Sequence, residues 1–382
     1  MHIAFYAPMK PPDSAIPSGD REMARNLVGA LERHHTVEIA SRFSSRDGTG
    51  NARRQDRIAA IGENLAARLV RRWRTGYPGV PDAWFTYHVY HKAPDWLGPS
   101  VSRALDIPYF MAEASHAPKQ AGGRWDTGYR GAETAIRAAD GIIGLSGADT
   151  ACVLPLLSDP ARYHRLAPFT DTAPLALAAG ARARHRRDIN AQFAIDAETP
   201  LLLAVGMMRD GDKLASYRVL ADALSRLAAR DWSLLIVGDG PARSETEAAF
   251  AALPAGRVTF AGAAAPGALP ALYAAADLMV WPAVNEAYGM AMLEAQAAGL
   301  PVVAGRTGGV PDVVRDTATG VLCPIGDAAQ FAAAIAGLLE QPDRLEAMRS
   351  RALAVTAAEN DTAAAARRLD EILRGGRKAR AA

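Results

Sequence analysis

The stretch Glu286-Ala-Tyr-Gly-Met-Ala-Met-Leu-Glu294, followed by Ala-Gln-Ala-Ala-Gly299-Leu-Pro301-Val-Val-Ala, decides the fold of this chain. Gly289 permits a tight entry into a helix, Gly299 ends that helix, and Pro301 opens an apolar strand. N–H groups at a helix start attract an anion, and carboxylates accept hydrogen bonds from hydroxyls. The stretch therefore suits a phosphorylated, polyhydroxylated ligand, although an ordinary amphipathic helix with two solvated glutamates has the same pattern.

Short apolar strands alternate with helices on both sides of this stretch, which is typical of parallel sheets covered by helices on both faces. We expect strands at 2–7, 37–40, 83–87, 109–112 and 141–145, and again at 201–205, 233–237, 258–260, 278–281, 302–304 and 320–322. Helices are expected at 20–33, 214–229, 268–275 and 362–373. The pattern predicts an α/β protein of two doubly wound, Rossmann-like domains facing a central cleft, with ligands beyond the carboxyl ends of the strands.

The two predicted domains are separated by residues 153–195, which have no clear period, contain several prolines and end in a basic run. We place the linker between the domains within this segment. The expected division is 1–180 for the first domain, 196–360 for the second, and 361–382 for a closing helix with a basic tail.

Composition excludes several classes of protein. The chain has 382 residues, 49% of them hydrophobic and 22% charged, which fits a globular protein of two or three domains. A net charge of +2 is too small to indicate a nucleic-acid partner. The two cysteines, Cys152 and Cys323, have no metal-ligand spacing, and the N-terminus does not read as a signal peptide. Because we also see no apolar run of about 18 residues, we expect a cytoplasmic protein.

Arginines cluster in three places. They occur at 53, 54, 57, 68, 71, 72 and 74 around Trp73, at 182, 184, 186 and 187, and in the tail at 374, 377 and 380 beside Lys378. Such Arg-rich patches suit contact with anionic lipid at a membrane surface, or with a charged acceptor. They are equally typical of solvated helix faces, and the sequence leaves both interpretations open.

Arg209 and Lys213 stand four residues apart, next to a glycine, after the first strand of the second half. The pair suits a pyrophosphate, because arginine binds two oxygens through its fork and lysine adds a point charge. Asp210 and Asp212 could hold a divalent metal, but this tripeptide is also a common turn former. We therefore expect no bound metal and no cofactor.

Several of these motifs together resemble, in order and spacing, the retaining glycosyltransferases of the GT-B fold, family four (glycosyl transferases group 1). The motifs are Gly206, Arg209, Lys213, the turn 238–241, Glu286 with Glu294, Gly299-Leu300-Pro301 and Gly308-Gly309. The resemblance is strong across residues 200–325 and weaker, but collinear, across 1–150. It implies that the second domain binds a nucleotide-sugar donor, that the first binds the acceptor, and that the closing helix crosses back to the first domain.

The resemblance also implies roles for individual residues on the donor side. Arg209 and Lys213 would hold the diphosphate, Glu286 would contact hydroxyls of the donor sugar, and Glu294 would bind the ribose. Backbone groups around Tyr288, Gly289 and Met290 would meet the phosphate and sugar. Near the nucleotide, the remaining donor-binding residues are Gly206, Asp239 and Gly240, although the turn 238–241 could instead only reverse the chain. Gly19 and Ser18 would approach the transferred sugar or the phosphate.

On the acceptor side, the segment Thr86–Trp96 is dense in polar aromatic residues after a strand. Tyr87, His88, His91 and Trp96 suit an acceptor pocket, although packing at a domain interface uses the same residue types. In the family a catalytic-site histidine lies near the end of the next strand, and Glu113 and His116 compete for that role here.

The expected function is therefore transfer of a sugar from a nucleotide-sugar donor to a hydroxyl of a glycan, lipid-linked or small-molecule acceptor, with retention of the anomeric configuration. Two alternatives remain open. One keeps the fold but epimerises or phosphorolyses its substrate, and the other is a non-catalytic protein that binds sugar nucleotides.

Overall fold

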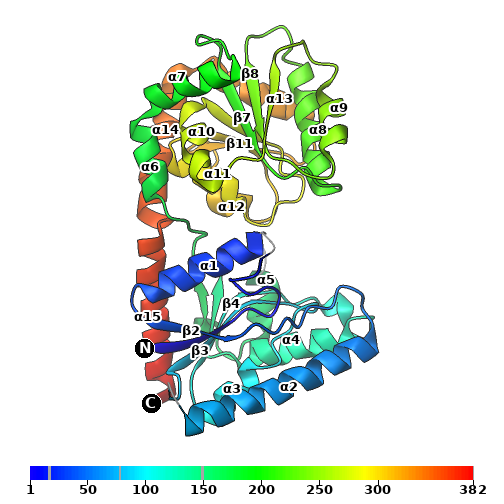
Figure 1. Cartoon of the computed structure of the whole chain (residues 1–382), viewed down its shortest axis with the longest axis vertical. Coiled ribbons are helices and arrows are strands. Elements are labelled where there is room, and N and C mark those ends of the chain that lie inside the picture. Colours follow the sequence, from blue (N-terminus) through cyan, green and yellow to red (C-terminus); the bar gives the residue numbers. More distant parts are fainter. Residues whose placement is uncertain (16–18, 77–78, 148–149, 382) are drawn as a thin grey trace. The chain divides into compact units, whose positions relative to one another are not determined.

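The computed structural model describes residues 1–15, 19–76, 79–147 and 150–381, and side chains throughout these ranges except at 266 and 377–381. The chain divides into two compact units (Figure 1). Met1–Ala167 and Thr362–Ala382 form the first unit, and Pro168–Asp361 form the second. Within the described ranges, no helix is both long and apolar enough to cross a membrane.

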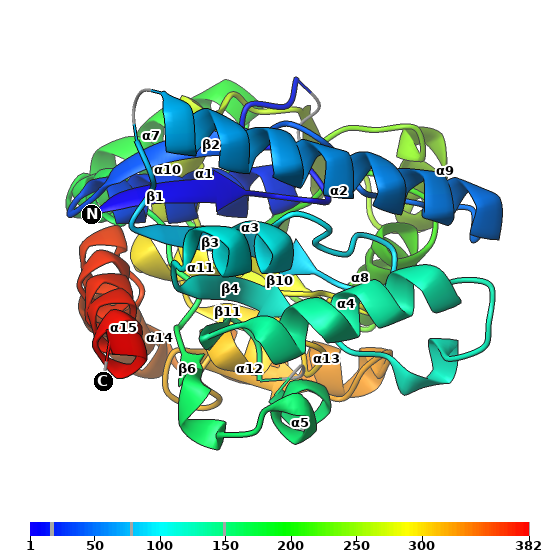
Figure 2. The ribbon, with the colours of Figure 1, turned by 90° about the horizontal axis from the view of Figure 1, so that it is seen from below.

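The first unit is built on a six-stranded parallel sheet with the order β2-β1-β3-β4-β5-β6. The strands are β1 His2–Tyr6, β2 Thr36–Ser41, β3 Ala83–Val89, β4 Tyr109–Ala114, β5 Gly141–Gly144 and β6 Tyr163–Arg165. Its helices are α1 Gly19–Glu32, α2 Ala52–Thr75, α3 Gly98–Leu105, α4 Asp126–Ala138, α5 Thr150–Val153 and α15 Thr362–Ala381. Helices α2, α3 and α4 lie side by side on one face of this sheet (Figure 2), and α15 packs against α1 and β5.

The second unit has a six-stranded parallel sheet with the order β12-β11-β10-β7-β8-β9. The strands are β7 Leu201–Val205, β8 Ser233–Val237, β9 Val258–Gly262, β10 Leu278–Trp281, β11 Val302–Gly305 and β12 Gly320–Cys323. Its helices are α6 Ala173–Gly180, α7 Arg182–Phe193, α8 Asp212–Ser225, α9 Arg243–Phe250, α10 Leu269–Ala275, α11 Met290–Ala297, α12 Val310–Val313, α13 Ala328–Leu339 and α14 Pro342–Glu359. Central strands such as β7 and β10 are apolar along their length because a parallel sheet is buried on both faces.

Both sheets have a point where the strand order reverses, and ligands of doubly wound proteins bind beside such points. In the first unit the reversal lies between β1 and β3, and in the second between β7 and β10. The predicted doubly wound α/β fold is confirmed in each unit, and all eleven expected strands are present.

The segment 153–195 differs from the expectation, because it is largely regular. It contains β6, α6 and α7, and both helices pack against α10. The chain passes into the second unit between Ala167 and Pro168, which lies within the expected linker segment 153–195 but before the expected domain bounds of 180 and 196.

Candidate active site

The candidate donor site of the second unit lies where β7 and β10 leave the sheet side by side. Gly206, Arg209 and Lys213 follow β7, with Lys213 in the first turn of α8. Glu286 follows β10 after a short loop. The strand order therefore brings together two motifs that lie 73 residues apart along the chain.

Lys213 and Glu286 form the centre of this site. The Lys213 ammonium nitrogen lies 2.5 Å from Glu286 Oε2, and the Trp281 indole N–H donates to the same oxygen at 3.3 Å. The ammonium also lies 5.2 Å from the centroid of the Trp281 ring, which packs edge-on against Tyr217. Both charged side chains are partly exposed, so their charges offset each other while remaining accessible to a ligand.

Arg209 is the cation of this site that has no compensating acid. Its side chain is exposed, and within the described residues it makes no ion pair or side-chain hydrogen bond. Asp212, by contrast, accepts a hydrogen bond from the Asn285 amide at 2.8 Å. No group of three or more His, Cys, Asp or Glu side chains in the described ranges is arranged to hold a metal ion.

Helix α11 begins beside these charges, as the sequence predicted. Gly289 is its N-cap and adopts the left-handed φ of +76° that favours glycine, and a Cβ there would lie 2.4 Å from Met292 Cε. No side chain of the described residues caps the helix, so the N–H groups of Met290 and Ala291 have no side-chain partner that would compete with an anion. Tyr288 and Met290 flank Gly289 and are partly buried.

Glu294, the second glutamate of the motif, has a buried partner that the sequence did not reveal. The hydroxyl of Tyr273, on α10, donates to Glu294 Oε2 at 2.9 Å. Burial, and then the nearby Glu294 carboxylate, raise the pKa of Tyr273 well above its usual value. Tyr273 therefore stays protonated and holds the orientation of Glu294 on α11.

The glycine turns of the second unit pack against its own loops. A Cβ at Gly238 would lie 1.9 Å from the Gly206 carbonyl oxygen, and one at Gly240 would lie 2.2 Å from that of Met208. Asp239 between them accepts from the Gly240 N–H at 2.8 Å and from Arg243 at 3.2 Å. This turn therefore fixes the path of the chain that carries Gly206 and Arg209.

The pair Gly308-Gly309 packs closely against the loop that carries Glu286. A Cβ at Gly308 would lie 2.1 Å from the Glu286 carbonyl oxygen, and one at Gly309 would lie 2.3 Å from that of Ala287. The Gly309 N–H also donates to the Ala287 carbonyl at 2.8 Å. These glycines thus let the loop that carries Glu286 lie directly on the start of α12.

A second polar cluster lies in the first unit, where β1 and β3 are neighbours at the reversal of strand order. His88 Nδ1 is 3.1 Å from Asp20 Oδ1 in the first turn of α1, and 3.7 Å from Glu113 Oε1 at the end of β4. His88 and Glu113 both have left-handed backbone, with φ of +63° and +58°. Strained backbone of this kind concentrates at functional sites.

The charges of this second cluster are partly buried. Only 11% of the Glu113 side chain is exposed, and its Oε2 makes no hydrogen bond within the described part of the chain. Burial raises the pKa of Asp20, but the hydrogen bond and charge of His88, with Lys10, outweigh it, so the net pKa is lowered. The cluster therefore holds an ionised carboxylate against an imidazole.

His116, the competitor of Glu113 for the catalytic role, does not join this cluster in the contacts that the structure shows. Its ring stacks on Tyr129 of α4, with Nε2 3.2 Å from the Tyr129 hydroxyl and 3.8 Å from Glu133 Oε2. Burial lowers the pKa of His116, which Glu133 partly opposes. His116 therefore packs between β4 and α4 as a largely buried, neutral side chain.

The residues that we expected in an acceptor pocket have different surroundings in the structure. Tyr87 is buried, and its ring contacts His88, which belongs to the cluster above. Trp96 fills the space between α2 and α4, where a Cβ at either Gly62 or Gly131 would lie 2.4 Å from it. Trp96 thus packs between these helices, and His91 lies edge-on to Trp125.

Gly19 is the first residue of α1, one residue before the start that we expected for this helix. Ser18, which we had grouped with it, lies outside the described residues. The structure instead identifies Asp20, one residue further on, as the side chain that reaches His88.

Two members of the second arginine cluster, Arg182 and Arg186, have structural roles. Arg182 donates to the carbonyls of Ala274, Ala275 and Ala276 at the end of α10, at 2.9 to 3.0 Å. Arg186 lies 2.8 Å from Asp277, which also pairs with Arg182. These two arginines therefore close the end of α10 and are not available as an electrostatic face.

Comparison with known proteins finds similar sequences and similar folds. Residues 199–341 match the family model of the glycosyl transferases group 1. A D-inositol 3-phosphate glycosyltransferase of Salinispora tropica is 31% identical over 249 residues, which are 61% of this chain and 51% of that protein. An alpha-D-kanosaminyltransferase of Streptomyces kanamyceticus is 30% identical over 190 residues, 50% of this chain and 49% of that one. The chain thus matches about half the length of these relatives.

Solved structures match along nearly the whole chain. A glycosyltransferase of Rickettsia africae superimposes with a TM-score of 0.75 at 15% identity, covering 98% of both chains. HepE of Anabaena, in complex with UDP and glucose, superimposes with a TM-score of 0.69 at 18% identity, covering 97% of this chain and 99% of that one. The fold is therefore that of the GT-B glycosyltransferases. The match of residues 199–341 to the model of the glycosyl transferases group 1 agrees with the resemblance noted across residues 200–325.

Proposed function

We propose that this chain is a retaining glycosyltransferase that moves a sugar from a nucleoside diphosphate sugar to an acceptor hydroxyl. The observation that carries the proposal is the Lys213–Glu286 pair beside the uncompensated Arg209, at the reversal of strand order in the second unit. The relatives named above are glycosyltransferases, and the HepE structure contains UDP, so we take UDP as the first nucleotide to test.

The donor diphosphate would bind Arg209, Lys213 and the start of α11. Its negative charge competes with Glu286 for the Lys213 ammonium, which frees the Glu286 carboxylate to accept hydrogen bonds from the sugar. Glu294, held by Tyr273, would accept hydrogen bonds from the ribose. These two cations supply the charge that a departing diphosphate needs, so we propose that no divalent metal or cofactor is required.

In the transfer step, the bond between the anomeric carbon and the diphosphate oxygen breaks, and its electron pair leaves with the diphosphate. The acceptor oxygen forms the new bond on the same face of the sugar, which retains the configuration, and its proton passes to the departing phosphate oxygen. The transition state resembles an oxocarbenium ion. We propose that the first unit binds the acceptor, and that Asp20, His88 and Glu113 contact its hydroxyls.

The test separates donor binding from transfer. UDP should raise the melting temperature of the wild type, because it binds only the folded state. Lys213→Ala should weaken UDP binding at least about tenfold, through loss of a charge-assisted hydrogen bond. Arg218→Ala is the matched control, because it removes an exposed cation from the same helix α8 and should leave UDP binding unchanged.

Glu286→Gln should behave in the opposite way. It removes the acid that competes for Lys213, so UDP should bind as tightly or more tightly, while turnover of UDP-glucose falls about a hundredfold because the sugar loses its partner. Unchanged turnover would refute the role of Glu286. Product analysis by NMR checks retention, and release of an epimer or of glucose 1-phosphate would favour the alternative reactions.

A further inference from the structure

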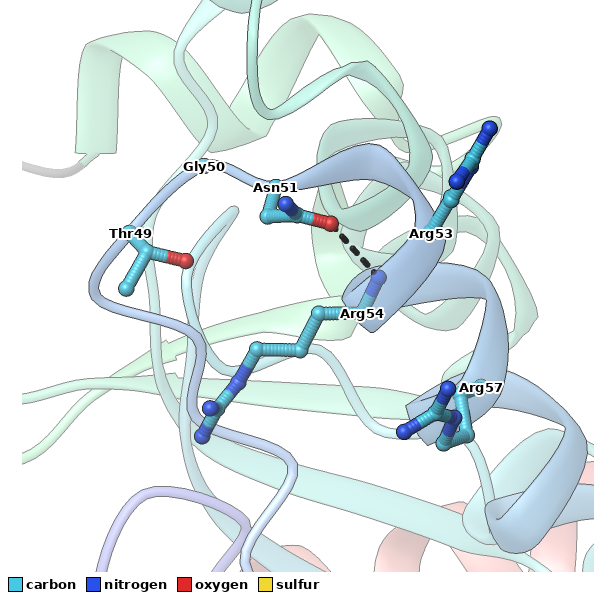
Figure 3. A pocket seen from close by; sticks show the side chains of 6 residues that line it. All are labelled: Thr49, Gly50, Asn51, Arg53, Arg54 and Arg57. Carbon is cyan, nitrogen blue, oxygen red and sulfur yellow. Dashed lines mark hydrogen bonds between the residues drawn. The ribbon is translucent and has the colours of Figure 1, made fainter.

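An open hollow of about 570 Å³ lies in the first unit, where the loop after β2 enters helix α2. It is lined by Thr49, Gly50, Asn51, Arg53, Arg54 and Arg57 (Figure 3). None of these residues belongs to the two polar clusters described above. Because the loop follows the carboxyl end of a parallel strand, the hollow lies on the edge of the sheet where doubly wound proteins bind ligands.

The loop that forms the hollow is fixed from behind by Asp47. Only 3% of the Asp47 side chain is exposed, and it accepts hydrogen bonds from the N–H groups of Thr49, Gly50 and Asn51 at 3.0, 2.8 and 3.2 Å. Asn51 in turn caps α2 by accepting from the Arg54 N–H at 3.0 Å (Figure 3). The helix end is therefore already capped, and the charge of the hollow comes from its side chains.

The arginine side chains of the hollow are largely uncompensated. Arg53 and Arg57 are exposed, lie one turn apart on α2, and make no ion pair or side-chain hydrogen bond within the described residues. Arg54 faces Asp47 at 3.6 Å, and that carboxylate is already occupied by the loop. Arg130, an exposed arginine of the same unit, instead pairs with Asp126 on its own helix. The hollow thus holds an excess of positive charge.

Two neighbouring loops add cations at the rim. A Cβ at Gly50 would lie 2.4 Å from Arg124 Nε, so the glycine lets Arg124 cross the loop. Arg124 and Lys92 both lie over the Trp125 ring, 4.6 and 4.8 Å from its centroid. These residues follow β4 and β3, so loops that follow β2, β3 and β4 all contribute positive charge.

Aromatic rings connect this rim with the Asp20–His88–Glu113 cluster. Trp125 contacts His91 with ring centroids 5.7 Å apart, His91 contacts Tyr90 at 5.3 Å, and Tyr90 contacts His88 at 5.1 Å. All four rings are partly exposed. A continuous strip of rings suits a sugar-containing molecule, and the hollow at its end suits an anion.

We propose that the hollow binds a phosphate group carried by the acceptor, so that the acceptor of this enzyme is anionic. That the phosphate belongs to the acceptor rests on the proposed function. Binding of phosphate in the hollow does not depend on that function. Arginine forks bind phosphate oxygens in pairs, which suits a phosphate group in this hollow. The phosphate belongs either to a soluble phosphorylated sugar or to a lipid headgroup.

The test uses the full chain and two double variants of helix α2. R53A/R57A removes two cations from the hollow, whereas R68A/R71A removes two exposed arginines from the far end of the same helix. Binding of glucose 6-phosphate and of glucose is measured by calorimetry. Binding to phosphatidylcholine vesicles with and without phosphatidylglycerol is measured by co-sedimentation.

We expect the wild type to bind glucose 6-phosphate or the anionic vesicles, and glucose and neutral vesicles much more weakly. R53A/R57A should weaken that binding about tenfold or more, and R68A/R71A should not. Equal weakening by the two double variants, or no binding of either phosphate probe by the wild type, would overturn the proposal. UDP binding by the wild type is measured in parallel. A wild type that does not bind UDP would count against the proposed donor and not against the phosphate site in the hollow.

Discussion

At the scale of single residues, glycine decides how closely the loops of the donor site approach each other. Gly308 has a φ of +47° and lies under the carbonyl of Glu286, and Gly309 donates to Ala287 beside it. The position of the Glu286 side chain, and so its contact with Lys213, depends on this packing. The sequence motif identified these glycines, but the structure shows that glycine is needed there because two loops of the protein are in contact.

Gly308→Ala tests this dependence. The new Cβ would lie 2.1 Å from a backbone oxygen in a conformation that alanine rarely adopts, so we expect a loss of about 1–3 kcal/mol in the free energy of unfolding. The Glu286 loop should move, and UDP-glucose turnover should fall with it. Denaturant unfolding and turnover measure the two effects.

Gly337→Ala is the control for that substitution. Gly337 lies inside α13, where an added Cβ meets no described atom within 4 Å, so alanine should stabilise by up to about 1 kcal/mol. A Gly308→Ala protein as stable and active as Gly337→Ala would contradict our reading of the loop contact.

At the scale of secondary-structure elements, helices α10 and α11 of the second unit differ in how the protein caps their ends. Helix α11 has no side-chain cap at its start, where we propose that the donor phosphate binds. The end of α10 is instead closed by Arg182 and Arg186, which bind its last carbonyls and Asp277. An open end is useful where a ligand completes it, whereas a partly buried end needs partners from the protein.

Arg182→Ala should therefore destabilise the second unit. It removes the arginine donor of the Ala274 and Ala276 carbonyls, whereas Ala275 keeps its bond from Arg186, at an expected cost of about 1–3 kcal/mol in the free energy of unfolding. Arg184→Ala is the control, because Arg184 is 77% exposed and its pairing with Asp188 is worth under about 0.5 kcal/mol. Chemical denaturation measures the unfolding midpoints of both variants. Equal midpoints would contradict the role of Arg182.

At the scale of the whole molecule, the first unit contains four histidines whose pKa values are lowered. They are His35, His91, His116 and His164, and burial is the largest cause for each. The neutral form is favoured in the folded protein, so the unfolded chain binds more protons between the lowered pKa and the ordinary value of about 6.5. Their contribution to stability is therefore complete above that value and is lost as the pH falls below it.

We accordingly expect the first unit to lose stability between about pH 7 and pH 5. Hydrogen exchange measured at pH 7, 6 and 5, corrected for intrinsic rates, should show falling protection in β1 to β5. His116→Gln should make this dependence shallower by at most about one proton, because glutamine does not titrate in this range. Protection in the first unit that does not change with pH would contradict the prediction.

Much of the fold could be predicted because strands and helices have local signals. The eleven expected strands exist, and the helix at α11 begins at Gly289 as the motif indicated. The strand β6 was missed, since Tyr163–Arg165 is short and partly polar, and α6 and α7 were missed because one is almost wholly apolar and the other mostly polar. Neither helix shows the alternation of faces that marks an amphipathic helix.

The candidate site was predicted less completely. Glu286 and Lys213 were both selected from the sequence, but Trp281 and Tyr273, which hold the two glutamates, read only as apolar strand and helix residues. Asp20 lay in the expected first helix, and nothing in its neighbourhood along the chain pointed to His88, 68 residues away.

The sequence by itself determined the succession of strands and helices, because the spacing of apolar side chains is a local property of the chain. It also determined which charged residues follow strand ends. Only the tertiary structure decided which of them meet. Lys213 reaches Glu286 because β7 lies beside β10, and Asp20 reaches His88 because β1 lies beside β3. Strand order depends on packing between distant segments, which local periodicity does not record.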